Sequence, residues 1–445
     1  MTATLEPDLR TAPSTRRQRS TPRHYRRASL ALCALLLVLL AVAEISATNG
    51  SDSTRELSAN TGPVLVSVQG VVASLAQADA AATAAILSGT AEDREQRNQY
   101  VDALARSEIE LERVSALIGD DQEAHDLLQD IQTKVSRYAG LVEAARVQTL
   151  SSFPGAQATL VEAAALLTEI SHDATRLTSV SERRFNNEAD RRSAGFPVTV
   201  LLFVAVVVAL VYAQMDVARR SRRVLNVPLV LATLLVIGVF SWAVVIDQRA
   251  RADLDAAQHE AYDSIAATAA IQAQGFTAKS AETLALITSD PASRQVADAA
   301  MKKLSSRTDD ATAAGALATQ ARAGAHLPDQ GLVFDAVNAA DSPRERAVAA
   351  DMLDNWGRYR ASVNELRGAT GDAAKAIARG SLSSTFSGFN ASVESVLGDN
   401  EGQYRDALQH ASDRYFLADV VMLAGLLGAM ALVVTGYRLR TREYQ

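Results

Sequence analysis

The chain has 445 residues, a formal net charge of −7 and a single cysteine, Cys33. The negative charge excludes a nucleic-acid binder that relies on bulk positive charge. One cysteine excludes an intrachain disulfide and a thiolate zinc site. Hydrophobic residues make up 48% of the chain but aromatic residues only 5%, and glycine and proline are sparse. Because this composition is typical of long packed helices, we expect an all-α fold rather than a β-sandwich.

Four segments are apolar over about the 20 residues that a membrane-spanning helix needs. We predict transmembrane helices at residues 28–48, 196–213, 227–246 and 415–437. Tyrosine and tryptophan lie at several of the segment ends, where amphipathic rings favour the headgroup region. The sequence therefore predicts an all-α membrane protein with four spans.

Arginines in the short flanks set the orientation of the spans. They cluster in the tail at residues 1–27, the loop at 214–226 and the tail at 438–445. All three flanks lie on one side if all four segments span, and the positive-inside rule makes that side the cytoplasm. We therefore expect a multi-pass protein of the cell (plasma) membrane with both termini cytoplasmic. The long segments 49–195 and 247–414 then lie outside.

The first apolar segment has a second interpretation. Arginines, an apolar stretch and Ala41-Val42-Ala43 also resemble a cleavable signal peptide. The apolar stretch is long for a signal peptide, and a repeated plan calls for a membrane helix here. We expect the first span to be retained.

The order of span, outer segment and span occurs twice, and faint sequence echoes support a tandem repeat. The segment Ala81–Thr90 reads AATAAILSGT, and Ala281–Asp290 reads AETLALITSD. Arg137-Tyr138 and Arg358-Tyr359 share the spacing of the valine and arginine that follow them. The repeat predicts that both outer segments share one architecture.

The first outer segment has the hydrophobic spacing of packed helices. Turn signals such as Gly119-Asp120-Asp121 separate four periodic stretches, so we predict a four-helix bundle. Asp120-Asp121 could attract cations, but a helix cap is the simpler interpretation. The clearest apolar seam is formed by Leu128, Ile131, Val135, Tyr138, Val142 and Ala145.

The second outer segment repeats the plan less regularly. Its first helix should end at Ser289-Asp290-Pro291, and a later helix should begin near Ser342-Pro343. The last helix should run from about Asp372 into the fourth span. Gly324–Asp341 reads as an irregular loop, which is more often functional than a short turn. We expect it to contact an outer partner.

No catalytic motif, cofactor fingerprint or metal-ligand spacing occurs in the sequence, so we expect no enzyme activity, no cofactor and no metal. Glu44, Asp247 and Asp419 lie near span ends, where a carboxylate needs no functional explanation. The spans carry no ionisable residue and no Gly/Pro break at their midplane. This argues against a transport subunit, which remains the third alternative.

Two groups of residues are candidates for partner binding. The first is the cytoplasmic cluster Arg219, Arg220, Arg222 and Arg223, which could dock a protein or only set topology and attract anionic lipid. The second is Trp356 with Tyr359, which could line a ligand pocket, although core packing is the commoner use of such residues.

Paired spans framing an outer helix bundle resemble the sensor halves of chemoreceptors and sensor kinases, but here no large cytoplasmic output domain follows. The two modules, the Arg219–Arg223 loop and the arginine-rich composition resemble the actinobacterial GlnX family. That resemblance implies a position between an amino-acid-binding lipoprotein, GlnH, and the soluble protein kinase PknG.

We therefore expect a non-enzymatic receptor that couples an outer solute, or a solute-binding protein, to a cytoplasmic partner such as a Ser/Thr protein kinase. Formation of a homo-oligomer is compatible with this function. The alternative is an envelope scaffold without sensing. A ligand-dependent change in a cytoplasmic partner distinguishes the receptor from the scaffold.

Overall fold

The computed structural model describes residues 21–56, 62–87, 94–149, 153–193, 196–221, 226–255, 263–306 and 311–442. All fourteen regular elements in these ranges are helices, with no strand among them. The chain divides into two compact units. The membrane unit comprises residues 1–52, 190–250 and 412–445, and the bundle unit comprises residues 53–189 and 251–411.

The membrane unit consists of α1 (Thr21–Glu56), α6 (Phe196–Ser221), α7 (Val227–Asp255) and the last part of α14 (Ser381–Arg442). Aliphatic side chains from all four helices form its core. Gln214 donates a hydrogen bond of 2.8 Å to the Thr233 hydroxyl, so a polar contact joins α6 to α7. Such polar side chains are commonly paired between membrane helices.

Five described helices are long and apolar enough to cross a bilayer, which indicates a multi-pass membrane protein. Four of these candidate spans are 18–28% buried, as expected for helices that present apolar side chains to lipid. The fifth, at Pro63–Leu87, is 67% buried by other helices. It lies in the bundle unit, where protein covers most of its surface.

The first half of the bundle unit contains α2 (Gly62–Leu87), α3 (Arg94–Leu117), α4 (Gln122–Gln148) and α5 (Phe153–Ser193). The predicted seam along α4 is confirmed, because all six of its residues are buried. Asp121 caps α4 by accepting a hydrogen bond from the Ala124 amide, which supports the capping interpretation. The sequence also predicts a turn at Ser88-Gly89-Thr90, and these residues lie outside the described ranges.

The second half of the bundle unit is divided more finely than the predicted four-helix plan. The structure describes seven helices there. These are α8 (Asp263–Thr288), α9 (Pro291–Leu304), α10 (Ala311–Arg322), α11 (Leu332–Ala339), α12 (Pro343–Gly368), α13 (Gly371–Arg379) and the first part of α14.

Two predicted boundaries in this half are confirmed. The helix α8 ends at Thr288, and Asp290 caps α9, which begins with Pro291. The helix α12 begins at Pro343, where Ser342 and Glu345 form a reciprocal capping box. The predicted last helix is interrupted, because α13 ends at Arg379 and Gly380 precedes α14.

The prediction of an irregular loop at Gly324–Asp341 is wrong in its second half. Residues 332–339 form α11, and Val333, Phe334 and Val337 are buried. The preceding stretch is tied to this helix by Asn338, whose amide side chain bonds both the N–H and the carbonyl of Leu327. The segment is therefore part of the core rather than a replaceable loop.

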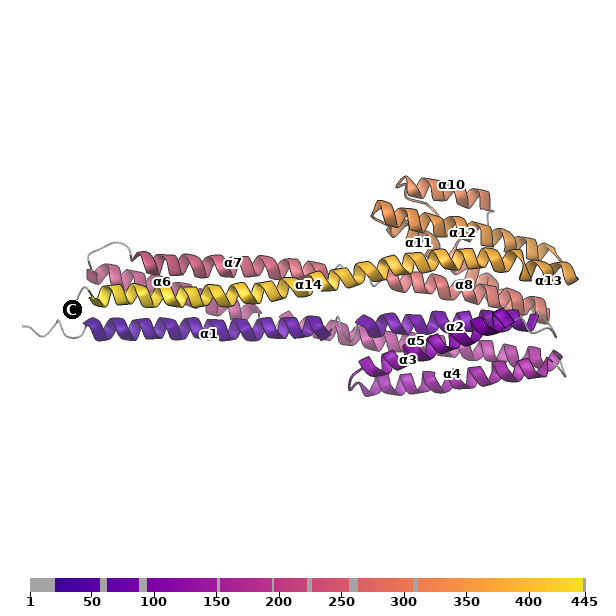
Figure 1. Cartoon of the computed structure of the whole chain (residues 1–445), viewed down its shortest axis with the longest axis horizontal. Coiled ribbons are helices and arrows are strands. Elements are labelled where there is room, and N and C mark those ends of the chain that lie inside the picture. Colours follow the sequence, from indigo (N-terminus) through magenta and orange to yellow (C-terminus); the bar gives the residue numbers. More distant parts are fainter. Residues whose placement is uncertain are drawn as a thin grey trace, which may run out of the picture. The chain divides into compact units, whose positions relative to one another are not determined.

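The two halves of the bundle unit pack against each other through α2 and α8, which lie side by side (Figure 1). Ala76, Ala80, Ile86 and Leu87 of α2 belong to the same buried cluster as the core of the second half. The second half alone would therefore leave part of its apolar surface uncovered. The bundle unit is one packed body with two cores that meet at α2.

Candidate functional site

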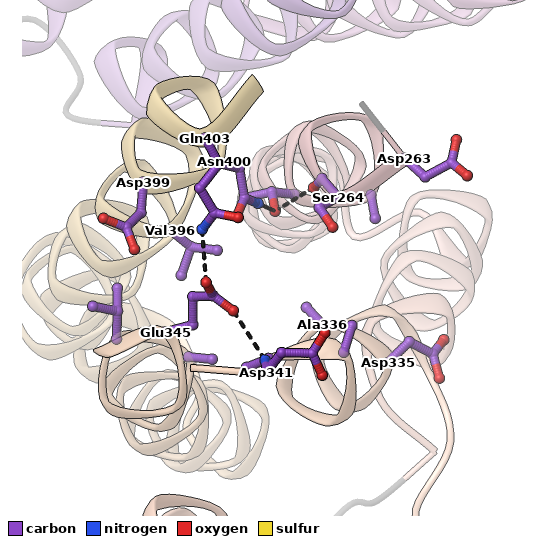
Figure 2. A pocket seen from close by; sticks show the side chains of 16 residues that line it. Asp263, Ser264, Asp335, Ala336, Asp341, Glu345, Val396, Asp399, Asn400 and Gln403 are labelled. Atoms are coloured by element: carbon purple, nitrogen blue, oxygen red, sulfur yellow. Dashed lines mark hydrogen bonds between the residues drawn. The ribbon is translucent and has the colours of Figure 1, made fainter. Parts of the chain in front are cut away.

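A pocket of about 610 Å³ lies in the second half of the bundle unit (Figure 2). This volume is in the range of pockets that hold small molecules. Its walls come from the start of α8, from α11 and the link that follows it, from the start of α12, and from α14. The polar lining residues are Asp263, Ser264, Thr268, Asp335, Asp341, Glu345, Asp399, Asn400 and Gln403.

The rest of the lining consists of small apolar side chains, mostly alanine. Ala336, Ala339 and Ala340 come from α11 and its end, and Val348 and Ala349 come from α12. Phe334 and Val337 anchor α11 from its buried face. Because alanine fills little space, packing of α11 against the core leaves a hollow above its other face.

Glu345 is held rigidly at one side of the pocket. Its carboxylate accepts hydrogen bonds from the backbone N–H of Asp341 at 2.9 Å and from the Gln403 side chain at 2.8 Å. Partial burial raises the pKa of Glu345, but the backbone and side-chain donors outweigh this and lower its pKa below the ordinary value. Figure 2 shows Glu345 and Asp341 across the opening from Asn400. Glu345 is thus a fixed negative charge.

A second hydrogen bond joins the opposite walls. Asn400 of α14 donates to the buried Thr268 hydroxyl of α8, with 3.2 Å between the two atoms. Thr268 in turn donates to the Ser264 carbonyl within α8. Within the described ranges the amide oxygen of Asn400 accepts no hydrogen bond, and the wall is fixed before any ligand arrives.

The pocket is strongly acidic. Five of its lining side chains are carboxylates, and none is basic. The Arg344 guanidinium forms an ion pair of 2.7 Å with the Asp399 carboxylate, although the Arg344 side chain is largely exposed. Asp263, Asp335 and Asp341 have no ion-pair partner among the described residues. A positively charged group entering the pocket would therefore meet uncompensated negative charge.

The carboxylates do not converge as metal ligands do. Within the described ranges, no three His, Cys, Asp or Glu side chains are close enough together to hold a metal ion. Figure 2 shows the Glu345 carboxylate turned towards the opening, whereas the carboxyl groups of Asp263, Asp335 and Asp399 point away from it in different directions. That spacing suits an extended organic cation better than a compact ion.

A second polar site lies inside the bundle unit, between α2, α4 and α8. Asp79 accepts a hydrogen bond from the Ser280 hydroxyl at 2.5 Å and from the Tyr138 hydroxyl at 3.2 Å. Thr83 contacts Ser280 at 3.3 Å. All four side chains are buried, so this cluster joins the two halves in a region that excludes water.

Trp356 and Tyr359 lie in the core of the second half. Tyr359 is fully buried and stacks near Phe386 and Phe389 of α14, with its ring centroid 5.1 Å from that of Phe386. The ring centroids of Trp356 and Phe389 are 5.3 Å apart. Both side chains are apart from the pocket lining, and a protein partner could touch them only if the core opened.

The arginine cluster is described only in part. Arg219 is exposed near the end of α6, and Arg220 lies on the same helix, which continues through residues 214–221 rather than ending at 213. Arg222 and Arg223 lie outside the described residues. The structure therefore places one of the four side chains at a surface of the membrane unit.

Sequence reasoning missed both the pocket and the buried acid. The pocket gathers residues from helices up to 140 positions apart, as Asp263 and Gln403 show, and no local spacing predicts that. Asp79 did carry a signal, because it is the one ionisable residue of the apolar helix α2. An isolated acid in such a segment indicates a specific partner.

Residues 53–190 match the family described as an actinobacterial sensor domain. The match covers α2–α5, the first half of the bundle unit. No curated protein matches the chain, and no solved structure matches it. A sensor domain within a multi-pass membrane protein of helical bundles indicates a sensing role.

Proposed function

We propose that the protein is a non-enzymatic receptor of the plasma membrane that relays an extracytoplasmic signal to a cytoplasmic partner. In this proposal four helices span the membrane, namely α1, α6, α7 and the last part of α14. The helix α2 belongs to the outer bundle unit, because most of its surface is already covered by protein. The termini and the end of α6 lie in the cytoplasm, as the arginine distribution favours.

The observation that carries this proposal is the match of residues 53–190 to a sensor domain. That domain shares a packed core with the half of the bundle unit that contains the pocket. A ligand in the pocket would contact α8 and α14, which both pack within this body. Packed helices can switch between discrete arrangements, which is a physical route for a relay.

The pocket favours a solute with an ammonium or guanidinium group. Three carboxylates without an ion-pair partner would attract the charged group, and the alanine-rich wall would cover an aliphatic body. Basic amino acids and short diamines have both features. A solute-binding protein could deliver such a molecule or contact the pocket rim itself.

The inner end of the relay is proposed at Arg219 and its three neighbours at positions 220, 222 and 223. This short segment connects α6 to α7, so it joins the two modules on the cytoplasmic side. A soluble protein kinase is the partner in this proposal, and it would supply the output activity of the relay. Arginine side chains form strong bidentate bonds with carboxylates of such a partner.

Calorimetric titration of the full-length protein in lipid nanodiscs tests the proposed ligand class. Arginine, lysine and putrescine are the probes, and glutamate is the anionic control. We expect the cationic probes to bind and glutamate not to bind. Asp335→Asn combined with Asp341→Asn should weaken binding by at least about tenfold, because two attractive charges are lost. Asp120→Asn removes an exposed carboxylate of the first half and should change nothing.

Equal binding of glutamate, equal affinity in the double variant, or no binding of any cationic probe would contradict the assigned pocket chemistry. The receptor role would be contradicted separately, if a bound cation changed nothing at the cytoplasmic end of α6.

A further inference from the structure

In each half of the bundle unit, a side chain donates a hydrogen bond to a backbone carbonyl at a helix end of the other half. Arg379 of the second half donates a hydrogen bond of 2.8 Å to the Leu87 carbonyl at the end of α2. Gln157 of the first half donates one of 2.6 Å to the Ile287 carbonyl near the end of α8. Carbonyls at a helix end lack partners within their own helix. Here each is satisfied by a side chain from the opposite half.

The two accepting carbonyls occupy corresponding positions. Leu87 and Ile287 are 200 residues apart, as are Thr83 and Thr283. Thr83 donates to the carbonyl four residues before it at 3.0 Å, and Thr283 does the same at 2.8 Å. Both threonines are buried. Residues of α2 and α8 that are 200 positions apart therefore match in three respects: their carbonyls at the helix end accept a bond from the other half, their threonine hydroxyls bond in the same way, and both threonines are buried.

The helix pair also meets with small residues at its centre. Ala80 and Ser280 are corresponding residues on α2 and α8, and both are almost fully buried. Small side chains allow two helices to approach closely. Thr83 contacts Ser280 at 3.3 Å. If a two-fold axis runs between α2 and α8, the matching contact joins Ala80 and Thr283.

One position breaks this symmetry. Asp79 accepts a hydrogen bond from Ser280 across the interface. The corresponding pair in a symmetric interface would be Lys279 and Ala80, and the Ala80 side chain offers no acceptor for the ammonium group. The Lys279 ammonium instead lies 4.8 Å from the Phe386 ring centre within its own half. The carboxylate bond at the centre of the interface is thus one-sided, because Asp79 supplies it and Lys279 supplies no matching bond.

We propose that α2 and α8 form an isologous, pseudo-two-fold interface, so that one chain supplies both halves of a dimer-like body and Asp79 is the positioning residue that fixes their register. The same patch of each repeat contacts the other, as in a two-fold homodimer. A shift of α2 or α8 in one half then also moves the helix of the other half that packs against it. This arrangement of the bundle unit does not depend on the proposed ligand.

Disulfide trapping in full-length protein tests the symmetry. In a Cys33→Ser background, Thr83→Cys with Ser280→Cys should form an intramolecular disulfide under mild oxidation. Ala80→Cys with Thr283→Cys should form one with similar efficiency, because it is the symmetry-related contact. The control pair Thr83→Cys with Thr277→Cys should not, since Thr277 lies about one turn away and bonds within its own helix. Formation of the first disulfide without the second would overturn the isologous arrangement.

Hydrogen exchange with mass spectrometry tests the positioning role of Asp79. Ser280→Ala leaves the buried Asp79 carboxyl with one partner fewer, so the α4 peptide containing Tyr138 should exchange about tenfold faster, although Ser280 belongs to the other half. Thr277→Ala, one turn away on α8, should leave that peptide unchanged. Asp79→Ala should accelerate exchange in α8, and Asp79→Asn should restore protection, because an amide can still bond Ser280. Changes confined to the half that carries each mutation, or no recovery with Asp79→Asn, would contradict the proposed tie.

Discussion

Arg367 of α12 forms an ion pair with Glu282 of α8, a side chain that is only 2% exposed. The guanidinium also lies 2.7 Å from Asp298 of α9, so one cation joins three helices of the second half. Burial lowers the pKa of Arg367, but the hydrogen bonds to both carboxylates outweigh it and raise the pKa above its ordinary value. A buried carboxylate that loses its cation is strongly unfavourable.

Arg367→Leu should therefore destabilise the protein by about 2–3 kcal/mol, below the range for fully buried pairs because Arg367 is 28% exposed. Urea unfolding followed by circular dichroism measures the change. Arg358→Leu is the control, since Arg358 is exposed and pairs with Asp354 one turn away, where a loss within about 0.5 kcal/mol is expected. Equal effects of the two substitutions would contradict the role assigned to Arg367.

Lys279 makes stability depend on pH in the alkaline range. Burial lowers the pKa of Lys279 from 10.5 to about 8. Between pH 8 and 10.5 the unfolded chain binds more protons than the folded protein, so the unfolding free energy rises with pH in this window. Below pH 8 both states carry the proton, and the folded state bears the full cost of about 3 kcal/mol.

Lys279→Met should therefore stabilise the protein by up to about 3 kcal/mol at pH 7, and the gain should shrink towards pH 10. Thermal unfolding at both pH values measures the difference from the parent. Lys302→Met removes a charge from an exposed site of α9 and should change little at either pH. A pH-independent gain in Lys279→Met would show that packing, not the buried charge, is responsible.

Gly357 permits the close approach of α12 and α10. A Cβ atom at this position would lie 2.2 Å from the Ala314 Cβ, so the two helices would have to separate. Gly357→Ala should cost about 1–3 kcal/mol. Gly140 of α4 has nothing within 4 Å of such a Cβ. Gly140→Ala should instead stabilise by up to about 1 kcal/mol, because alanine favours a helix interior. Denaturant midpoints of the two variants should move in opposite directions.

The orientation of the proposed receptor predicts a pattern of labelling in intact cells. In a Cys33→Ser background, cysteines at the exposed positions Ala105 and Ala347 of the bundle unit should react with an impermeant maleimide from outside. A cysteine at Arg219, at the end of α6, should react only after permeabilisation. Protection of either bundle position until lysis would reverse the proposed topology.

Helices were predicted correctly from the sequence where a periodic apolar pattern begins or ends at a capping residue or a proline. The α4 seam is buried because one face of that helix packs on a core. Pro291 and Ser342-Pro343 mark helix starts, because proline suits the first turn of a helix and serine caps its free N–H groups. The helix α11 was missed because eight residues carry too few turns for a period to emerge.

The helices that pack on α2 could not be predicted from periodicity. Its mean composition is apolar on nearly every face, and such a helix suits a membrane or a protein core equally. Which helix covers which face depends on partners far away in the sequence, such as Ser280, which is 201 residues from Asp79. The pocket was hidden for the same reason, and the sequence predicted only the helix start at Ser342-Pro343, which lies next to the pocket residue Glu345.

Hydrogen exchange at the end of α6 shows whether a bound ligand changes the cytoplasmic end of the receptor. The full-length protein in nanodiscs is measured with and without the cationic probe that binds in calorimetry. We predict that the probe changes exchange in the α6 peptide ending near Arg219, and that Asp335→Asn combined with Asp341→Asn abolishes this change at the same probe concentration. Saturating binding in the parent protein with unchanged exchange throughout α6 would contradict the account, because the ligand would then be bound without any signal crossing the membrane.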